Sequence, residues 1–143
     1  MAEVHKRVEA ELENIERVVA ELPDNDSLPN LSSLELAGVA TLIHNFYNGI
    51  ENILKQIVIS CGKELPDGPS WHRDLVNVAT SNDIISESTA KELRRYLAFR
   101  HFFSHGYSFD LDKERIVPLA KNIQGILASF RDDISKTLKK FSR

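Results

Sequence analysis

The stretch "SSLELAGVATLIHNFYNGIENILKQIVISCG", residues 32–62, predicts the fold class of this chain. Ser32 followed three residues later by Glu35 has the pattern of a capping box, which opens an α-helix. Gly62 is suited to end the helix, because glycine adopts the left-handed conformation of helix C-termini. Between these ends, apolar side chains recur every three or four residues, as one face of a long helix requires. These positions are Val39, Leu42, Ile43, Phe46, Ile50, Ile53, Leu54, Ile57, Val58 and Cys61.

The flanking segments have the same helical periodicity. Residues 1–22 form one amphipathic pattern, and residues 71–80 predict a short helix. Residues 87–105 predict a further long helix, with Ser86 or a neighbour as its N-cap and Gly106 as its stop. No segment shows the alternation of a β-strand, and no internal repeat or low-complexity tract is present.

A last helix is predicted around the apolar positions from Ile123 to Leu138. Pro118 must lie near the first turn of this helix or kink it, because proline lacks the amide hydrogen of a helix interior. Asp110 and Asp112 could coordinate a cation, but N-capping this helix is the simpler account. The sequence therefore predicts an all-α fold, an antiparallel bundle of four long helices plus one short helix. We expect residues 1–143 to form a single domain.

The composition is that of a globular protein, with 42% hydrophobic and 27% charged residues. No apolar run approaches the roughly 20 residues that cross a bilayer, and the charged N-terminal segment does not resemble a signal peptide. We therefore expect no membrane association. The single Cys61 cannot form an internal disulfide, and no zinc-ligand pattern is present. These features favour the reducing cytoplasm and predict neither a metal nor a cofactor.

Charge is distributed unevenly along the chain, although the net charge is only −3. Residues 1–30 hold eight acidic and three basic side chains. Residues 91–121 hold seven basic and four acidic side chains. The basic segment indicates a local site for an anionic ligand.

The basic segment surrounds "FRHFFSHGYSFD", residues 99–110, where Arg100 and His105 are five residues apart. On one helix these side chains point about 140° apart with about 7.5 Å of rise between them, so one copy makes a poor self-contained site. Two copies packed about a two-fold axis would bring two arginines and two histidines into one cleft. Such a cleft suits RNA cleavage by the 2′-hydroxyl, because histidine transfers protons near neutral pH and arginine binds phosphate oxygens.

Structural roles are the alternative for these residues, because an arginine and a histidine at this spacing often occur by chance. A histidine ahead of a glycine is commonly a capping residue. Elsewhere, His44 is expected to be packed, His72 to be a surface or capping residue, and Trp71 to be a core anchor. At least two of the three phenylalanines near the motif are expected in the core or in a dimer interface: Phe99, Phe102 and Phe103.

The segment "RHFFSHGY", residues 100–107, resembles the Arg-x4-His-x-Tyr motif of the HEPN superfamily, in particular the HepT-like ribonuclease toxins. The segment "NFYNGIENILKQI", residues 45–57, is similar to the second helix of that family. The segment "SWHRDLV", residues 70–76, is similar to the segment that precedes the motif helix. The resemblance covers most of the chain in helix order and length.

The resemblance implies a metal-independent endoribonuclease that dimerises with its motif helices facing each other. It implies that Arg100 and His105 are catalytic and that RNA, with tRNA as a known target class, is the substrate. It also implies a nucleotidyltransferase antitoxin of the MNT type, which would neutralise the toxin by transferring AMP onto Tyr107. Further candidates for supporting or RNA-binding roles are His101, Ser104 and Arg95. The alternative function is a non-catalytic HEPN module that binds nucleotide or substrate for a partner nucleotidyltransferase.

Overall fold

The computed structural model describes residues 2–105 and 112–141. Within these ranges the chain forms five α-helices and one short 3-10 helix, and no β-strand. This confirms the predicted all-α fold with four long helices and one short helix. The elements are α1 (Ala2–Ala20), η1 (Leu28–Asn30), α2 (Ser33–Ser60), α3 (Trp71–Ser81), α4 (Glu87–His105) and α5 (Lys113–Phe141).

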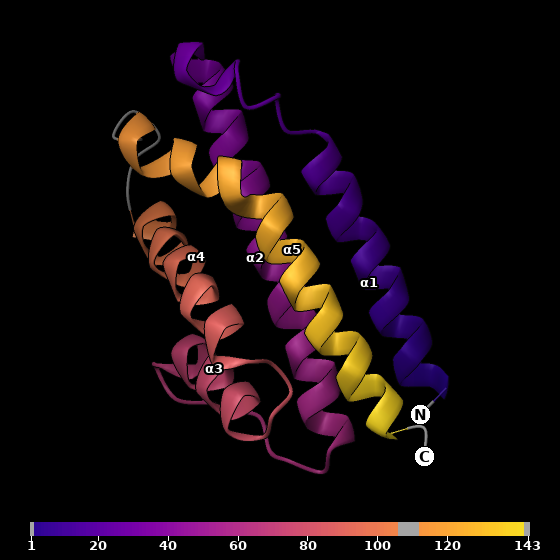
Figure 1. The fold of residues 1–143 in the computed structure, drawn as a ribbon. Helices are drawn as coiled ribbons and strands as arrows, with labels where there is room; N and C mark the ends of the chain where they lie inside the picture. The colour runs from indigo at the N-terminus through magenta and orange to yellow at the C-terminus, as the bar shows by residue number, and fades with distance from the viewer. Residues whose placement is uncertain (1, 106–111, 142–143) are drawn as a thin grey trace.

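The long helices α1, α2, α4 and α5 run alternately in opposite directions, so the bundle is antiparallel (Figure 1). The central element is α2, which contacts α1, α3, α4 and α5. Because α2 is surrounded, its apolar stripe is covered by partners along its length. The short α3 lies at one end of the bundle, beside α2 and α4. In the described part of the chain, no helix combines the length and apolar character needed to cross a membrane.

Both predicted ends of α2 are confirmed by their hydrogen bonds. The Ser32 hydroxyl accepts a hydrogen bond from the Glu35 amide at 3.1 Å, and the Glu35 carboxylate accepts one from the Ser32 amide at 3.0 Å. At the other end, Gly62 has a φ of 77°, and its amide donates to the carbonyl of Ile59 at 2.9 Å. The amide of Lys63 donates to the carbonyl of Val58 at 3.2 Å, which completes a Schellman motif.

The last helix begins earlier than its apolar pattern, at Lys113. Asp112 caps it as predicted, because its carboxylate accepts a hydrogen bond from the Glu114 amide at 3.0 Å. Pro118 lies inside the helix, in its second turn. Figure 1 shows that α5 changes direction near its start, as expected where proline removes a backbone hydrogen bond.

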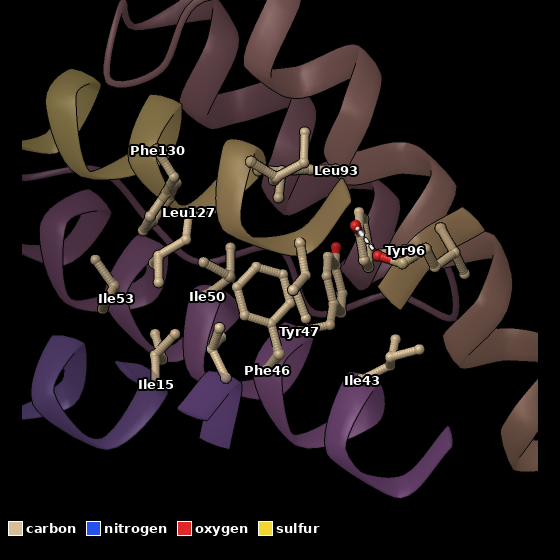
Figure 2. Close-up of a cluster of buried hydrophobic side chains, with 14 of the residues drawn as sticks. Ile15, Ile43, Phe46, Tyr47, Ile50, Ile53, Leu93, Tyr96, Leu127 and Phe130 are labelled. Atoms are coloured by element: carbon tan, nitrogen blue, oxygen red, sulfur yellow. Dashed lines mark hydrogen bonds between the residues drawn. The ribbon is translucent and has the colours of Figure 1, made fainter. Parts of the chain in front are cut away.

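The core lies where α1, α2, α4 and α5 meet (Figure 2). One polar group within it is satisfied across the bundle, because the Tyr96 hydroxyl donates to the carbonyl of Leu119 at 2.7 Å. This hydrogen bond ties α4 to the bent part of α5. The side chains labelled in Figure 2 are Ile15, Ile43, Phe46, Tyr47, Ile50, Ile53, Leu93, Tyr96, Leu127 and Phe130.

Candidate functional site

The position of the motif helix α4 is set by contacts along its length. At its N-terminus the Ser86 hydroxyl accepts a hydrogen bond from the Thr89 amide at 3.2 Å, so the predicted N-cap is confirmed. The Ser86 amide also donates to the Asp133 carboxylate of α5 at 3.0 Å. Further along, Tyr96 is bonded to α5 and Phe99 is only 2% exposed. The segment that carries Arg100 is therefore held in a defined orientation.

A groove of about 680 Å³ runs between α3 and α4. Its lining includes five side chains that are cationic or can become so, and among the described residues that line it none is acidic. Leu97, Ala98 and Pro69 supply an apolar surface within the groove. The five basic side chains are His72 and Arg73 of α3 and Arg94, Arg100 and His101 of α4.

Arg100 lies at the inner side of this groove. Its side chain is partly buried, and its Nε atom is fully buried without a hydrogen-bond partner among the described residues. Arg100 also acts on α2: the pKa of His44 is held below its usual value, first by burial and second by the Arg100 charge. His44 is therefore a neutral imidazole near pH 7, and its ring packs against Phe103 at 4.9 Å between centroids. The expectation that His44 is packed is confirmed.

Two further polar residues of α2 lie behind the groove, Tyr47 and Glu51. Burial raises the pKa of Tyr47 above its usual range, and the nearby Glu51 carboxylate raises it further, so this phenol stays neutral. Glu51 is a buried carboxylate with a side chain only 4% exposed, and it accepts a hydrogen bond from Nδ1 of His72 at 2.7 Å. This pair joins α2 to α3 and orients an imidazole that lines the groove.

The expectation that His72 is a surface or capping residue was therefore wrong. Its side chain is only 20% exposed and holds a hydrogen bond to a core helix. Sequence reasoning also missed Glu51, although a signal was present. His44, Tyr47 and Glu51 are spaced by three and four residues, so they form a polar stripe beside the apolar face of the helix.

The remaining motif candidates do not all lie in the groove. His101 is exposed and lines it, whereas Ser104 is exposed on α4 outside its lining. Arg95 lies on the α5 side of α4, where it pairs with Glu92 at 3.2 Å. His105 is the last residue of α4, and its side chain lies outside the described part of the chain. Tyr107 also lies outside the described residues.

The three phenylalanines Phe99, Phe102 and Phe103 belong to the packing of the bundle, as expected. Phe99 is buried in the core and contacts Phe103 at 5.8 Å between ring centroids. Phe102 packs partly against the core. The guanidinium carbon of Arg115 lies over the Phe102 ring, 4.5 Å from its centroid. Trp71 likewise packs partly against the core. Across residues 2–105 and 112–141, no group of three or more His, Cys, Asp or Glu side chains is arranged to hold a metal ion.

Comparison with known proteins agrees with the all-helical fold. The structure of YutE, a cytosolic protein of unknown function from Bacillus subtilis, is similar, with a TM-score of 0.76. The similarity covers 95% of this chain and 91% of YutE at 18% sequence identity, so it concerns the fold alone. No curated protein matches the chain in sequence. The sequence model of the HepT-like protein family matches residues 38–141. Because this match spans well over half of the sequence, the chain belongs to the HepT-like protein family.

Proposed function

We propose that this protein is a metal-independent endoribonuclease toxin that acts in the cytoplasm as a homodimer. Its substrate is RNA, with tRNA as the target class, and its catalytic residues are Arg100 and His105. The proposal rests mainly on one observation. In a chain of the HepT-like family, Arg100 of the motif lines a groove whose other ionisable side chains are all basic. Such a groove suits a polyanionic substrate.

The reaction follows from the chemistry of these two side chains. The 2′-oxygen of a ribose attacks the adjacent phosphorus while a His105 imidazole takes the hydroxyl proton. The bond from phosphorus to the 5′-oxygen breaks, and the leaving oxygen takes a proton from the imidazolium of the second subunit. The products are a 2′,3′-cyclic phosphate and a 5′-hydroxyl. Arg100 stabilises the charge that develops on the phosphate oxygens.

The surroundings of Arg100 support this role. Within the described residues, Arg100 has no carboxylate partner at ion-pair distance. The Arg100 side chain is also partly buried, and a charge in such a site acts on a ligand more strongly than one in bulk water. Both features suit a group that must stabilise charge on a phosphate.

We further propose that a small nucleotidyltransferase of the MNT type neutralises the toxin. The Tyr107 oxygen would attack the α-phosphorus of ATP, the phenol proton would be lost, and pyrophosphate would leave. The resulting adenylyl group is anionic and lies two residues beyond His105 in the sequence. It would compete with RNA phosphate for the same cations.

The test is a cleavage assay on purified tRNA in the presence of EDTA. Wild-type protein is expected to produce fragments with 2′,3′-cyclic phosphate ends, and Arg100→Ala and His105→Ala are expected to lose this activity. Arg131→Ala is the matched control, because Arg131 pairs with Glu16 of α1 outside the groove. Equal cleavage by wild type and both motif variants would exclude the assignment of Arg100 and His105.

Two further measurements separate the toxin from a non-catalytic binding module. Expression of the wild-type chain alone is expected to arrest growth, and His105→Ala is expected to abolish the arrest. Intact mass of the protein co-expressed with the nucleotidyltransferase is expected to rise in steps of one adenylyl group. Tyr107→Phe is expected to remove those steps. RNA binding without cleavage or growth arrest would favour the binding module.

A further inference from the structure

The groove between α3 and α4 contains more cationic groups than the proposed reaction uses. Arg100 belongs to the motif, but Arg73 and Arg94 do not, and they lie on the two helices that form the groove. We propose that this groove binds a single-stranded segment of the RNA next to the scissile bond, with Arg73 and Arg94 contacting its phosphates. This inference rests on the proposed function, because it extends the substrate beyond the phosphate at Arg100.

Both arginines are available to a phosphate ligand. Arg73 is exposed and forms no ion pair within the described residues. Arg94 pairs with the Glu87 carboxylate at 2.9 Å and donates to the side-chain oxygen of Asn77 at 3.3 Å. The Glu87 side chain is 71% exposed. An exposed ion pair of this kind contributes little to stability, so a phosphate can replace Glu87 at little cost.

The spacing of the cations favours a chain of phosphates over a single anion. Arg94 and Arg100 are six residues apart on α4, which is about 9 Å along the helix axis. Arg73 approaches from the opposite helix. An RNA strand whose scissile phosphate lies at Arg100 would place its next phosphates along this line.

The shape of the groove also suits a nucleotide chain. Its volume of about 680 Å³ is within the usual range for organic ligands. Leu97, Ala98 and Pro69 offer apolar surface on which a base or a ribose can rest. Inorganic phosphate would leave this surface uncovered. An unpaired strand is required, because paired bases could not reach the surface of the groove.

The start of α3 also lies at the groove, where Asp74 in the first turn offsets part of the helix dipole. The eleven-residue helix begins at Trp71, and Ser70, which lines the groove, makes no side-chain capping hydrogen bond. The helix dipole favours an anion at such an end. One residue into the helix, His72 has Nδ1 occupied by Glu51, so its other ring nitrogen is the one available to a ligand. Glu51 is thus a positioning residue for this imidazole.

Binding is tested with fluorescently labelled tRNA and full-length protein in the His105→Ala background, which prevents cleavage. The Kd is measured over a series of salt concentrations. Arg73→Gln and Arg94→Gln are each expected to weaken binding roughly threefold to tenfold. Each is also expected to lower the slope of log K against log salt by about 0.7, the value for one phosphate contact on a single strand. Arg131→Gln, which removes the same charge outside the groove, is expected to change neither quantity.

Charge-conserving variants distinguish the loss of a phosphate contact from a defect in folding. Arg73→Lys and Arg94→Lys are expected to retain the wild-type salt slope, because they retain the positive charge. The inference is overturned if Arg131→Gln weakens binding as much as the groove variants do, since the effect would then be one of net charge. It is also overturned if both groove variants keep the wild-type Kd and slope.

Two comparisons distinguish RNA from a free nucleotide as the ligand, and this inference from the proposed function. Free ATP and AMP serve as competitors, and displacement of the RNA by micromolar ATP through Arg73 and Arg94 would assign the groove to a nucleotide instead. Cleavage by wild-type protein without any effect of the groove variants would refute this inference and leave the proposed function standing. Binding that depends on the groove, in a protein that cleaves no RNA, would refute the proposed function alone.

Discussion

The close contact between α1 and α2 at Gly49 leads to a quantitative prediction for Gly49→Ala. A Cβ atom at this position would lie 2.5 Å from Cγ1 and 2.9 Å from Cδ1 of Ile15. Ile15 is 2% exposed and belongs to the core, so its side chain has little room to move. The methyl group of alanine therefore cannot be accommodated without separating the helices or distorting the Ile15 rotamer.

Two opposing terms determine the size of the effect. Alanine favours the helix over glycine by about 1 kcal/mol. Overpacking a core by one methyl group costs about 1–3 kcal/mol, and a contact more than 1 Å inside the normal carbon separation indicates the upper end of that range. We therefore expect Gly49→Ala to lower the free energy of unfolding by about 2 kcal/mol. Gly125→Ala, where no atom lies within 4 Å of the new Cβ, is expected to raise it by about 0.5–1 kcal/mol.

Urea unfolding followed by the helical circular dichroism signal measures both variants. The Ile15→Ala background supplies the decisive comparison, because it removes the two atoms that the new methyl group meets. There, Gly49→Ala is expected to stabilise the protein relative to Ile15→Ala alone. If Gly49→Ala and Gly125→Ala shift the urea midpoint in the same direction in the wild-type background, the packing argument is wrong.

Four further predictions concern the helix that carries the motif and the groups around it. Tyr96→Phe is expected to lower the free energy of unfolding by about 1–2 kcal/mol, because it removes a buried hydrogen bond; an unchanged urea midpoint would contradict this. Ser86→Ala removes the N-cap of α4 and is expected to cost about 1 kcal/mol and to speed amide hydrogen exchange in the first turn of α4. The lowered pKa of His44 means that the unfolded state binds more protons below about pH 6.5, so stability falls as the pH drops from 6.5 toward the folded pKa. In Arg100→Gln, the His44 pKa measured by NMR is expected to rise only part of the way toward the usual histidine value, because burial is the larger cause of its lowering. An unchanged His44 pKa would refute the proximity of the two groups.

The fold was largely predictable because local signals and the apolar pattern agree along the chain. The capping box at Ser32, the left-handed Gly62 and the cap at Ser86 are read from neighbouring residues alone. The start of α5 was less visible, because Pro118 interrupts the pattern that the rest of the helix shows. Proline inside a helix is unfavourable, and the contacts of α5 with α2 and α4 compensate for it.

The candidate site was predictable only in part. Arg100 was found because it stands at a motif spacing within a basic segment. Arg73 and Arg94 were not found, because neither spacing nor composition places α3 opposite α4. His72 was assigned to the surface because its partner Glu51 is 21 residues away and on another helix. The position of Glu51 among apolar residues of its helix was the available sign, because a buried carboxylate needs a hydrogen-bonding partner.

The sequence by itself determined which segments are helical, both ends of α2, the start of α4 and the faces that the helices bury, because these depend on residues three or four apart. The sequence also assigns the chain to its family, through the match over residues 38–141. Only the tertiary structure decided which polar side chains meet. Packing α3 and α4 against α2 creates the groove and the buried pair of Glu51 and His72. Contacts between distant segments follow from the packing of whole helices, which no local pattern specifies.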